Sequence, residues 1–351
     1  MEKYYTRACN FYYGNHSKYK LKKKASIPLN GNNLISFDTV EILSRNSKKV
    51  VHLNEIKNLP NRIKIKVKKD LKNISKKKYF KTLKFKSIPL IMGVVNTTPD
   101  SFSDGGKYLK NNLAIKQINK IIKEGAEIID VGGETSKPGS SYISPNTEWK
   151  RVEKKIKFLN KKKYYFSIDT QKKIIMEKSS KYGANLINDI SGFSYDEETL
   201  NFLKISKLPF IIHHIQGTPK DMQIQPKYKN VLLDIYDYFE KKLKIIRSMN
   251  INHRNIILDP GIGFGKNMKH NITLINQISI FHSLGYPVML GLSRKRFIKD
   301  VVKTNDSKER LGGTISSCIY SAMQGVQILR VHDVNEVKQA LKIYEAIQLR
   351  Q

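Results

Sequence analysis

The chain has 351 residues, of which 40% are hydrophobic, so it can bury the core of one large domain or of two modest ones. Its formal charge of +34 at pH 7 raises the question of a nucleic-acid or membrane-surface role, but lysine is spread along the whole chain, which argues against nucleic acid as a main partner. Only Cys9 and Cys318 occur, which excludes a disulfide framework and agrees with a reducing compartment. No apolar run approaches the ~18 residues of a membrane span, and the start lacks the apolar stretch of a secretion signal, so we expect a cytoplasmic protein.

Residues 1–87 differ from the remainder, because they are richer in lysine and lack long helical periods. The run from Leu34 to Leu43 is rich in β-branched and aromatic residues and predicts a strand. The run from Arg62 to Lys68 alternates apolar residues with lysine, as a half-exposed strand does. We therefore predict a small basic β-containing N-terminal extension that ends in a Lys-rich linker around Ser75 to Lys86. An RNA-binding arm is the alternative function for this region.

Residues 88–351 alternate short apolar runs with amphipathic segments, which is the length and rhythm of an α/β fold of the (β/α)8 TIM-barrel type. Eight runs predict buried parallel strands: Leu90–Val95, Ile128–Val131, Tyr165–Ile168, Leu186–Ile187, Phe210–Ile212, Ile256–Leu258, Val288–Leu290 and Ile328–Val331. Five segments predict helices: Leu113–Gly125, Glu148–Leu159, Val231–Met249, Leu311–Gly325 and Val334–Leu349. Gly125, Gly183 and Gly325 stand where helices would end.

The first barrel strand is followed by the most polar loop of the chain. The apolar run ends abruptly at Asn96, and T-T-P-D-S-F-S-D-G-G follows it. Such a run cannot continue a strand, so it predicts an exposed loop full of oxygen atoms and N–H donors. In a barrel of parallel strands the chemistry lies at the carboxyl ends, where this loop begins.

The same change from apolar to polar recurs at every predicted strand end. One buried carboxylate on a strand is usually structural, but eight coincidences predict a site. The side chains concerned are Asn96, Asp130, Glu134, Asp169, Asn188, Asp189, His213, His214, Gln216, Asp259, Ser293, Arg294, Lys295, Arg330, His332 and Asp333.

The types of these side chains indicate two kinds of ligand. Asp169, Asn188 and Asp259 are planar acceptors and amide donors, which suit a flat heterocycle rich in N–H and C=O groups. Arg330 and His332, together with the N–H groups of the first loop, suit a phosphate or a pyrophosphate.

Asn96 offers a hard oxygen that suits Mg²⁺, an ion that bridges phosphates while it keeps several waters. Together these groups predict a heterocycle at the bottom of a pocket, with an anionic leaving group at its mouth. No Ser/His/Asp triad, cysteine nucleophile or dinucleotide fingerprint is evident, and G-I-G-F-G-K lacks the spacing of a Walker A loop.

Over residues 89–349 the chain resembles the dihydropteroate synthases of folate biosynthesis. The motifs that carry the resemblance are N-T-T-P-D-S-F-S-D-G-G, D-V-G-G-E-T-S-K-P-G, N-D-I-S-G, Q-G-T-P-K-D-M-Q, L-D-P-G-I-G-F-G-K, G-L-S-R-K and R-V-H-D-V. The resemblance implies a transferase that joins 6-hydroxymethyl-7,8-dihydropterin diphosphate to p-aminobenzoate and releases pyrophosphate, with Mg²⁺ as cofactor. It also implies a homodimer.

The resemblance carries roles over to matching positions. Pterin binding falls to Asp169, Asn188, Asp259 and Lys295, with Arg330 stacked on the ring. Diphosphate binding falls to Asn96, Arg330 and His332, with Asn96 as the Mg²⁺ ligand, and the p-aminobenzoate side falls to Ser136, Pro138, Phe264 and Ser293. Asn96, Lys295, Arg330 and His332 are the residues expected to act in catalysis.

The chain departs from the family pattern in two places. In the second loop the usual G-G-E-S-T-R-P-G is replaced by a sequence with Thr135, Ser136 and Lys137, and His213 stands where a methionine is usual. A pterin-dependent methyltransferase of the same barrel type is the alternative enzyme, and it would not need the anion-binding groups of the first loop and of R-V-H-D. A basic scaffold or RNA-binding protein without activity is the alternative outside the enzymes.

Overall fold

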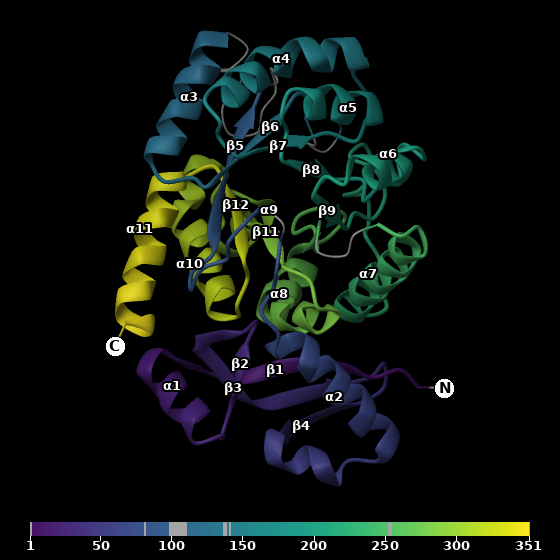
Figure 1. Ribbon diagram of the computed structural model, residues 1–351, viewed down its shortest axis with the longest axis vertical. Coiled ribbons are helices and arrows are strands. Elements are labelled where there is room, and N and C mark those ends of the chain that lie inside the picture. The colour runs from purple at the N-terminus through teal and green to yellow at the C-terminus, as the bar shows by residue number, and fades with distance from the viewer. Residues whose placement is uncertain are drawn as a thin grey trace.

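The computed structural model describes residues 2–80, 82–97, 111–135, 139, 142–251 and 255–350. Their strands form two sheets, a four-stranded antiparallel sheet in the N-terminal extension and an eight-stranded parallel sheet after it. In Figure 1 the extension, in purple and dark blue, lies below the parallel sheet and its helices.

The extension is a small α+β unit built around one long central strand. That strand, β3, pairs with all three of the others. The elements are β1 (Tyr5–Tyr13), α1 (Gly14–Lys22), β2 (Ile27–Leu29), β3 (Asn32–Leu43), β4 (Lys48–His52), a 3-10 helix (Leu53–Asn58) and α2 (Asn61–Ser75). The strand predicted at residues 34–43 is confirmed as part of β3.

The strand predicted from Arg62 to Lys68 is wrong, because these residues lie in helix α2. The alternation of apolar residues and lysine covers only a few positions, and Ile65, which it assigns to a buried face, is 70% exposed. Over the full helix the buried residues are Val67, Asp70 and Ile74, which follow the spacing of a helix face.

The parallel strands close into a barrel, as predicted. Their order is β10-β9-β8-β7-β6-β5-β12-β11, and a parallel bridge between Leu258 and Val288 joins the two ends. The strands are β5 (Leu90–Asn96), β6 (Ile128–Gly132), β7 (Phe166–Asp169), β8 (Leu186–Asp189), β9 (Phe210–His213), β10 (Ile256–Asp259), β11 (Met289–Gly291) and β12 (Ile328–Val331).

Helices follow the strands and cover the outside of the barrel (Figure 1). They are α3 (Asn111–Lys123), α4 (Pro145–Lys161), α5 (Lys173–Lys181), α6 (Thr199–Ser206), α7 (Val231–Ser248), α8 (Met268–Asn276), α9 (Arg296–Val302), α10 (Leu311–Met323) and α11 (Val334–Tyr344). All five predicted helices are confirmed, and the sequence analysis missed the short helices α5, α6, α8 and α9. Gly125, Gly183 and Gly325 have positive φ at helix ends, as predicted.

The inside of the barrel is divided into an apolar layer and a polar layer. Side chains alternate along a strand, so Met92, Ile257 and Ile328 share the interior, while the next residue of each strand packs among the surrounding helices. Two residues further along β10 and β12 the interior positions are Asp259 and Arg330. The strands therefore hold an apolar floor at their amino ends and place charged groups above it.

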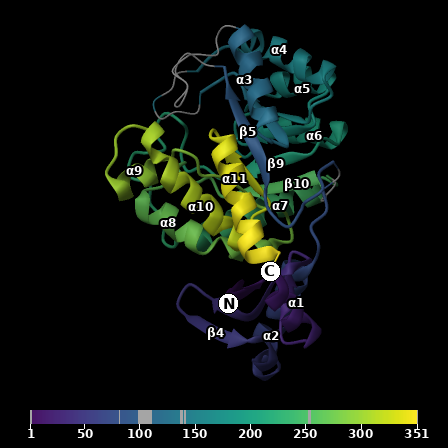
Figure 2. The same cartoon turned by 90° about the vertical axis from the view of Figure 1, so that its left-hand side faces the viewer.

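The extension is fastened to the outside of the barrel by charged and aromatic side chains. Lys3 Nζ lies 2.6 Å from Asp237 Oδ1 on α7, and the Tyr5 hydroxyl donates to the same carboxylate at 2.9 Å. The Tyr5 and Tyr236 rings meet edge to face, with centroids 5.1 Å apart. Figure 2, turned by 90°, again shows the extension below the barrel, close to the C-terminus of the chain. Among the described residues, no helix combines the length and the apolar character that crossing a membrane requires.

Candidate active site

A cavity of about 300 Å³ lies at the carboxyl ends of the strands. Its polar lining comes from several different strands, so only closure of the barrel could bring these side chains together. The lining residues include Asn96, Asp169, Phe264, Ser293, Lys295, Arg330 and His332. A recess of about 20 Å³ shares Phe264, Lys295 and Arg330 with this cavity and is also lined by Asn188, His213 and Asp259.

Arg330 bridges two carboxylates across the barrel interior. Its Nε donates to Asp130 Oδ2 at 2.6 Å, and its second guanidinium nitrogen donates to Asp169 Oδ2 at 2.7 Å. Burial opposes the charge of Arg330, but the two carboxylates outweigh burial and raise its pKa, so the guanidinium stays protonated. Because the planar group is held at both edges, its faces and one remaining edge are presented in a fixed orientation.

Asp130 is a counter-ion of Arg330 rather than a ligand-binding group, because both of its carboxylate oxygens already accept hydrogen bonds from neighbouring side chains. It is fully buried and also accepts hydrogen bonds from Ser167 Oγ at 2.5 Å and from Asn188 Nδ2 at 3.2 Å. Asp169 lines the cavity instead, and burial raises its pKa to about 7 against the opposing effect of Arg330. The two carboxylates therefore differ in role although Arg330 contacts both.

The recess combines acceptors with a wall of rings, as a flat heterocycle requires. Asn188 Oδ1 is buried and has no hydrogen-bond partner among the described residues, so it can accept from a ligand N–H. Burial raises the pKa of Asp259 to about 6, although the Gly261 amide donates to it at 2.8 Å. The rings of His213 and Phe264 meet edge to face, with centroids 4.6 Å apart.

Glycine is required in the loop that follows Asp259. Gly261 has φ +68°, and an added Cβ would lie 1.9 Å from the His214 carbonyl oxygen. The loop folds back over a buried lysine, Lys266, whose Nζ donates to the Gly261 oxygen at 2.9 Å and to the Phe264 oxygen at 2.8 Å. These contacts hold Phe264 at the junction of the cavity and the recess.

Lys295 lies between the two spaces. Its Nζ is 4.1 Å from the centre of the Phe264 ring, which is a cation–π distance. Burial and the neighbouring Arg330 lower the pKa of Lys295 to about 8, while Asp259 and Asp169 oppose this shift. The ammonium group therefore keeps its charge at neutral pH and can donate to an oxygen or nitrogen of a bound ring.

His332 and Ser293 form the opposite wall. Ser293 Oγ lies 3.2 Å from His332 Nδ1, and Arg294 holds Asp333 in a two-point ion pair beside them. Burial and the cations Arg330, Arg294 and Lys295 lower the pKa of His332, so the free ring is neutral and can offer one N–H to an anion.

Asn96 is the described residue best suited to a metal ion at this end of the barrel. Its side chain lines the cavity and makes no hydrogen bond with another described residue. No group of three or more His, Cys, Asp or Glu side chains suited to a metal occurs within the described ranges. The residues therefore fit Mg²⁺ only in the form that uses one protein oxygen together with phosphate oxygens and water.

Comparison with known proteins agrees with this geometry. A family described as pterin binding enzyme matches residues 92–332. The dihydropteroate synthase of Escherichia coli (strain K12) is 39% identical over 261 residues, which are 74% of this chain and 92% of the relative. The Yersinia pestis dihydropteroate synthase, solved with a sulfonamide drug complex, is 36% identical with a TM-score of 0.72 over 75% of this chain and 95% of that chain. The Xanthomonas albilineans dihydropteroate synthase, solved with 4-aminobenzoic acid, is 31% identical with a TM-score of 0.69 over 74% of this chain and 93% of that chain.

The chain belongs to the dihydropteroate synthase family. Like the other members it is a transferase of folate biosynthesis. Residues 1–87 lie outside the matched range.

The structure brings together most of the residues that the sequence and the family resemblance singled out. Nine of the ten expected site residues line the cavity or the recess: Asn96, Asp169, Asn188, Asp259, Phe264, Ser293, Lys295, Arg330 and His332. The tenth, Ser136, lies outside the described residues, as do Pro138 and Lys137.

Sequence reasoning missed several lining residues, of which Thr135, Met222, Gln223 and Arg296 are examples. All four stand within or beside motifs that had been noticed, namely D-V-G-G-E-T-S-K-P-G, Q-G-T-P-K-D-M-Q and G-L-S-R-K. Gln223 donates through Nε2 to the Gly263 oxygen at 2.7 Å and so joins two strand-end loops, a contact that no local pattern reveals.

Proposed function

We propose that this family member condenses 6-hydroxymethyl-7,8-dihydropterin diphosphate with p-aminobenzoate, giving 7,8-dihydropteroate and pyrophosphate. The observation that carries the proposal is that ring-binding acceptors and anion-binding cations line two adjacent spaces, which share Phe264, Lys295 and Arg330. In the reaction the arylamine nitrogen bonds to the exocyclic carbon of the pterin. The C–O bond to the diphosphate breaks, pyrophosphate leaves with the bonding electrons, and the amine loses one proton.

The difficult event is the departure of pyrophosphate, because the arylamine is neutral and needs no strong base. Catalysis then depends on groups that stabilise charge as it develops. Arg330 and His332 donate to the departing anion, and Lys295 remains close to both ligands. Asp169 and Asp259 hold the pterin and stabilise positive charge that develops on it.

The same proposal divides the ring-binding residues between the two substrates. Asn188, Asp259 and Lys295 bind the polar edge of the pterin where the recess meets the cavity, and the unpartnered Asn188 Oδ1 supplies an acceptor there. Phe264 and Ser293 form part of the p-aminobenzoate side, together with Ser136. The solved relative with 4-aminobenzoic acid supports this choice of second substrate.

Mg²⁺ is the cofactor that we propose, with Asn96 as its protein ligand. When bound there with the diphosphate, the ion supplies positive charge that favours the release of pyrophosphate. We further propose that residues 88–351 are the catalytic domain and that residues 1–87 are an accessory unit.

We also propose a homodimer in the cytoplasm. Helices α8, α9 and α10 are neighbours and expose apolar side chains, among them Ile272, Val301 and Tyr320. Burial of this surface by a second copy would remove it from water. The described cysteines are free, which agrees with a reducing compartment.

The test is pyrophosphate release by the purified and dialysed protein. We expect release only when the pterin diphosphate, p-aminobenzoate and Mg²⁺ are all present. Release that does not depend on p-aminobenzoate would contradict the proposal. Methyl transfer from a methylated folate to a corrinoid, measured in parallel, would favour the alternative enzyme.

A further inference from the structure

A buried ion triad lies at the edge of the cavity, and only one of its three residues lines the cavity wall. Lys172 Nζ donates to Glu134 Oε2 at 2.6 Å and to Glu148 Oε2 at 2.8 Å. The side chain of Lys172 is 4% exposed and that of Glu148 is fully buried, whereas Glu134 reaches the cavity wall. One ammonium group therefore joins a residue of the site to the packed interior.

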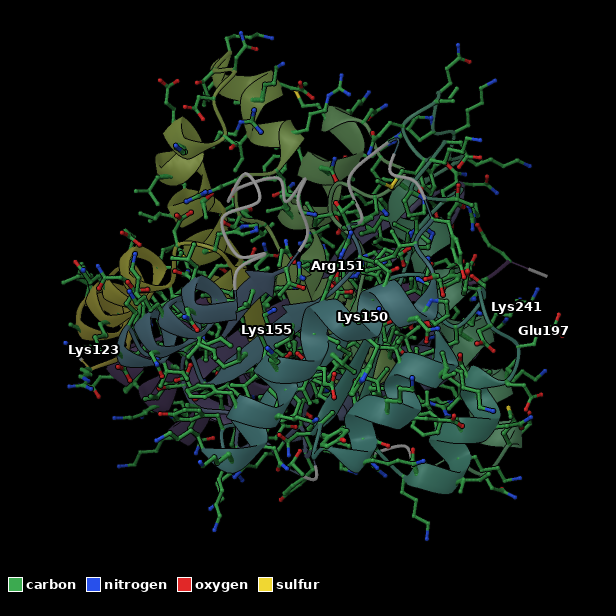
Figure 3. All side chains as sticks on the ribbon, turned by 90° about the horizontal axis from the view of Figure 1, so that it is seen from above. Lys123, Lys150, Arg151, Lys155, Glu197 and Lys241 are labelled. Atoms are coloured by element: carbon green, nitrogen blue, oxygen red, sulfur yellow. The ribbon has the colours of Figure 1, made fainter. Side chains whose placement is uncertain are left out.

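The triad connects three segments that are distant in the sequence. Glu134 follows β6, Lys172 directly precedes α5, and Glu148 lies in the first turn of α4. The backbone at Gly133 packs closely on α4, since an added Cβ there would lie 2.8 Å from Glu148 Cγ. Arg151, labelled on α4 in Figure 3, donates to the Gly133 oxygen at 3.0 Å.

Lys172 also reaches the far end of the segment that Glu134 begins. Glu134 Oε1 accepts from the Ile143 amide at 3.3 Å, and Lys172 Nζ lies 5.0 Å from the centre of the Tyr142 ring. Glu134 lines the main cavity together with Phe264 and Ser293 of the proposed p-aminobenzoate side, so the contacts of Lys172 lead to the wall of that substrate.

The cavity contacts assign Lys172 an indirect role. Glu134 and Thr135 line both the main cavity and a neighbouring cavity of about 210 Å³. Lys172 is not among the residues that line either of them. Any effect of Lys172 on a ligand in the main cavity must therefore pass through a residue that it contacts, and Glu134 is the contact that lines this cavity.

We propose that Lys172 is a positioning residue for the arylamine substrate, which acts by tethering Glu134 to Glu148 and so fixes the wall on which p-aminobenzoate docks. This inference rests on the proposed function. It goes beyond that function because it assigns a role to a residue that does not itself contact either substrate. Asn188, Asp259 and Lys295, which bind the pterin, line the recess without Glu134 or Lys172, so the pterin affinity should depend little on the tether.

The energetics favour a tether over a contribution to stability alone. Burial opposes the charge of Lys172, but Glu148 and Glu134 outweigh burial and raise its pKa. Burial also raises the pKa of Glu148, and Glu148 Oε1 has no partner among the described residues. A buried ion triad is weak evidence for stability, since a matched apolar replacement is often as stable, whereas its geometry is specific.

The test is a double-mutant cycle between Lys172 and Glu134 in a Glu148→Gln background. There the amide oxygen at position 148 can still accept from Lys172 Nζ, and removal of the lysine leaves no unpaired carboxylate at that position. Lys172→Met in that background should raise the KM for p-aminobenzoate roughly ten- to hundredfold, the scale of a misplaced binding wall. The Kd for the pterin diphosphate, measured by calorimetry, should change less than about twofold. Glu134→Gln should raise the same KM, and the combination with Lys172→Met should add little.

Lys155→Met is the matched control, because Lys155 on α4 is also buried but donates to the Arg151 oxygen at 2.6 Å (Figure 3). It should leave the KM for p-aminobenzoate unchanged. An unchanged KM in the Lys172 variant, an equal loss of pterin affinity, or additive effects of Lys172 and Glu134 would each overturn the inference.

A readout without turnover separates this inference from the proposed function. The Ile143 amide, which donates to Glu134, should exchange its hydrogen faster in the Lys172 variant than in the Lys155 variant. Equal exchange would overturn the tether. Faster exchange of the Ile143 amide in a protein that shows no p-aminobenzoate-dependent release of pyrophosphate would support the tether and contradict only the assigned substrate.

Discussion

The two ends of the barrel use the same strands for opposite purposes. At the amino ends the interior is filled by Met92, Ile257 and Ile328, and Phe80 and Phe85 of the preceding linker pack against this layer. Two residues further along β10 and β12 the interior positions are the charged residues Asp259 and Arg330, which border the recess and the cavity of about 300 Å³. A difference of two residues therefore separates a floor that stabilises the fold from a surface that does chemistry.

This comparison also explains the linker that precedes the barrel. Residues 75–86 were predicted only as a Lys-rich linker, but Phe80 is 6% exposed and its ring centre lies 6.3 Å from that of Phe85. The linker closes the amino end, so the carboxyl end is the open one. Charged groups can be kept at the open end because Asp130 and Asp169 compensate Arg330 there.

The largest expected effect is at the polar end. Arg330→Ala should lower kcat by roughly 10² to 10³, because it removes charge stabilisation from the departing anion. Arg330→Ala also leaves Asp130 buried without its cation, so thermal unfolding must show that the assayed protein is folded. Arg330→Lys retains the charge without the two-point geometry and should lie between the wild type and Arg330→Ala. Near-native turnover of folded Arg330→Ala would contradict the role.

The opposite result is expected at the apolar end. Met92 is fully buried in the floor, so Met92→Ala should lower the free energy of unfolding by about 2 to 5 kcal/mol through loss of contacts and creation of a cavity. The folded fraction should keep its kcat and both KM values. Denaturant titration and steady-state kinetics of the same preparation test this separation. A large loss of kcat in the folded protein would show that the apolar floor also contributes to catalysis and would contradict the prediction.

A smaller effect is expected within the recess. Asp259→Asn replaces the carboxylate with an uncharged group of similar shape and should weaken binding of the pterin diphosphate about tenfold, on the scale of one charge-assisted hydrogen bond. Calorimetry with the pterin diphosphate measures the change. The KM for p-aminobenzoate serves as the internal control, and an unchanged pterin affinity would remove Asp259 from the site.

The pH dependence of kcat/KM should sharpen the contrast further. Burial raises the pKa of Asp259 to about 6 and that of Asp169 to about 7, so their binding forms appear as pH rises through these values. Burial lowers the pKa of Lys295 to about 8, so its charged form is lost above that value. We expect a bell with its maximum between about 7 and 8. Lys295→Arg should move the alkaline limb upward and leave the acid limb, and an unmoved alkaline limb would exclude Lys295 as its origin.

Local sequence predicted the barrel well because each strand is a short apolar run that ends in a polar residue. This signal placed all eight strands within about two residues and led to Asn96, Asp169 and Asp259. Alternation, the signal used for residues 62–68, failed, because so few alternating residues are compatible with a strand or with a helix until their burial is known. The short helices α5, α6, α8 and α9 were missed because so few residues show too little of a helical period.

The sequence by itself determined the parallel barrel, the end at which chemistry occurs and most of the polar residues that border the cavity. These follow from alternation along each strand, which is a local property. Only the tertiary structure decided which charges compensate one another, as with Arg330 between Asp130 and Asp169 or Lys172 between Glu134 and Glu148. Such pairs join residues from separate strands and loops, and their distances exist only after the barrel has closed.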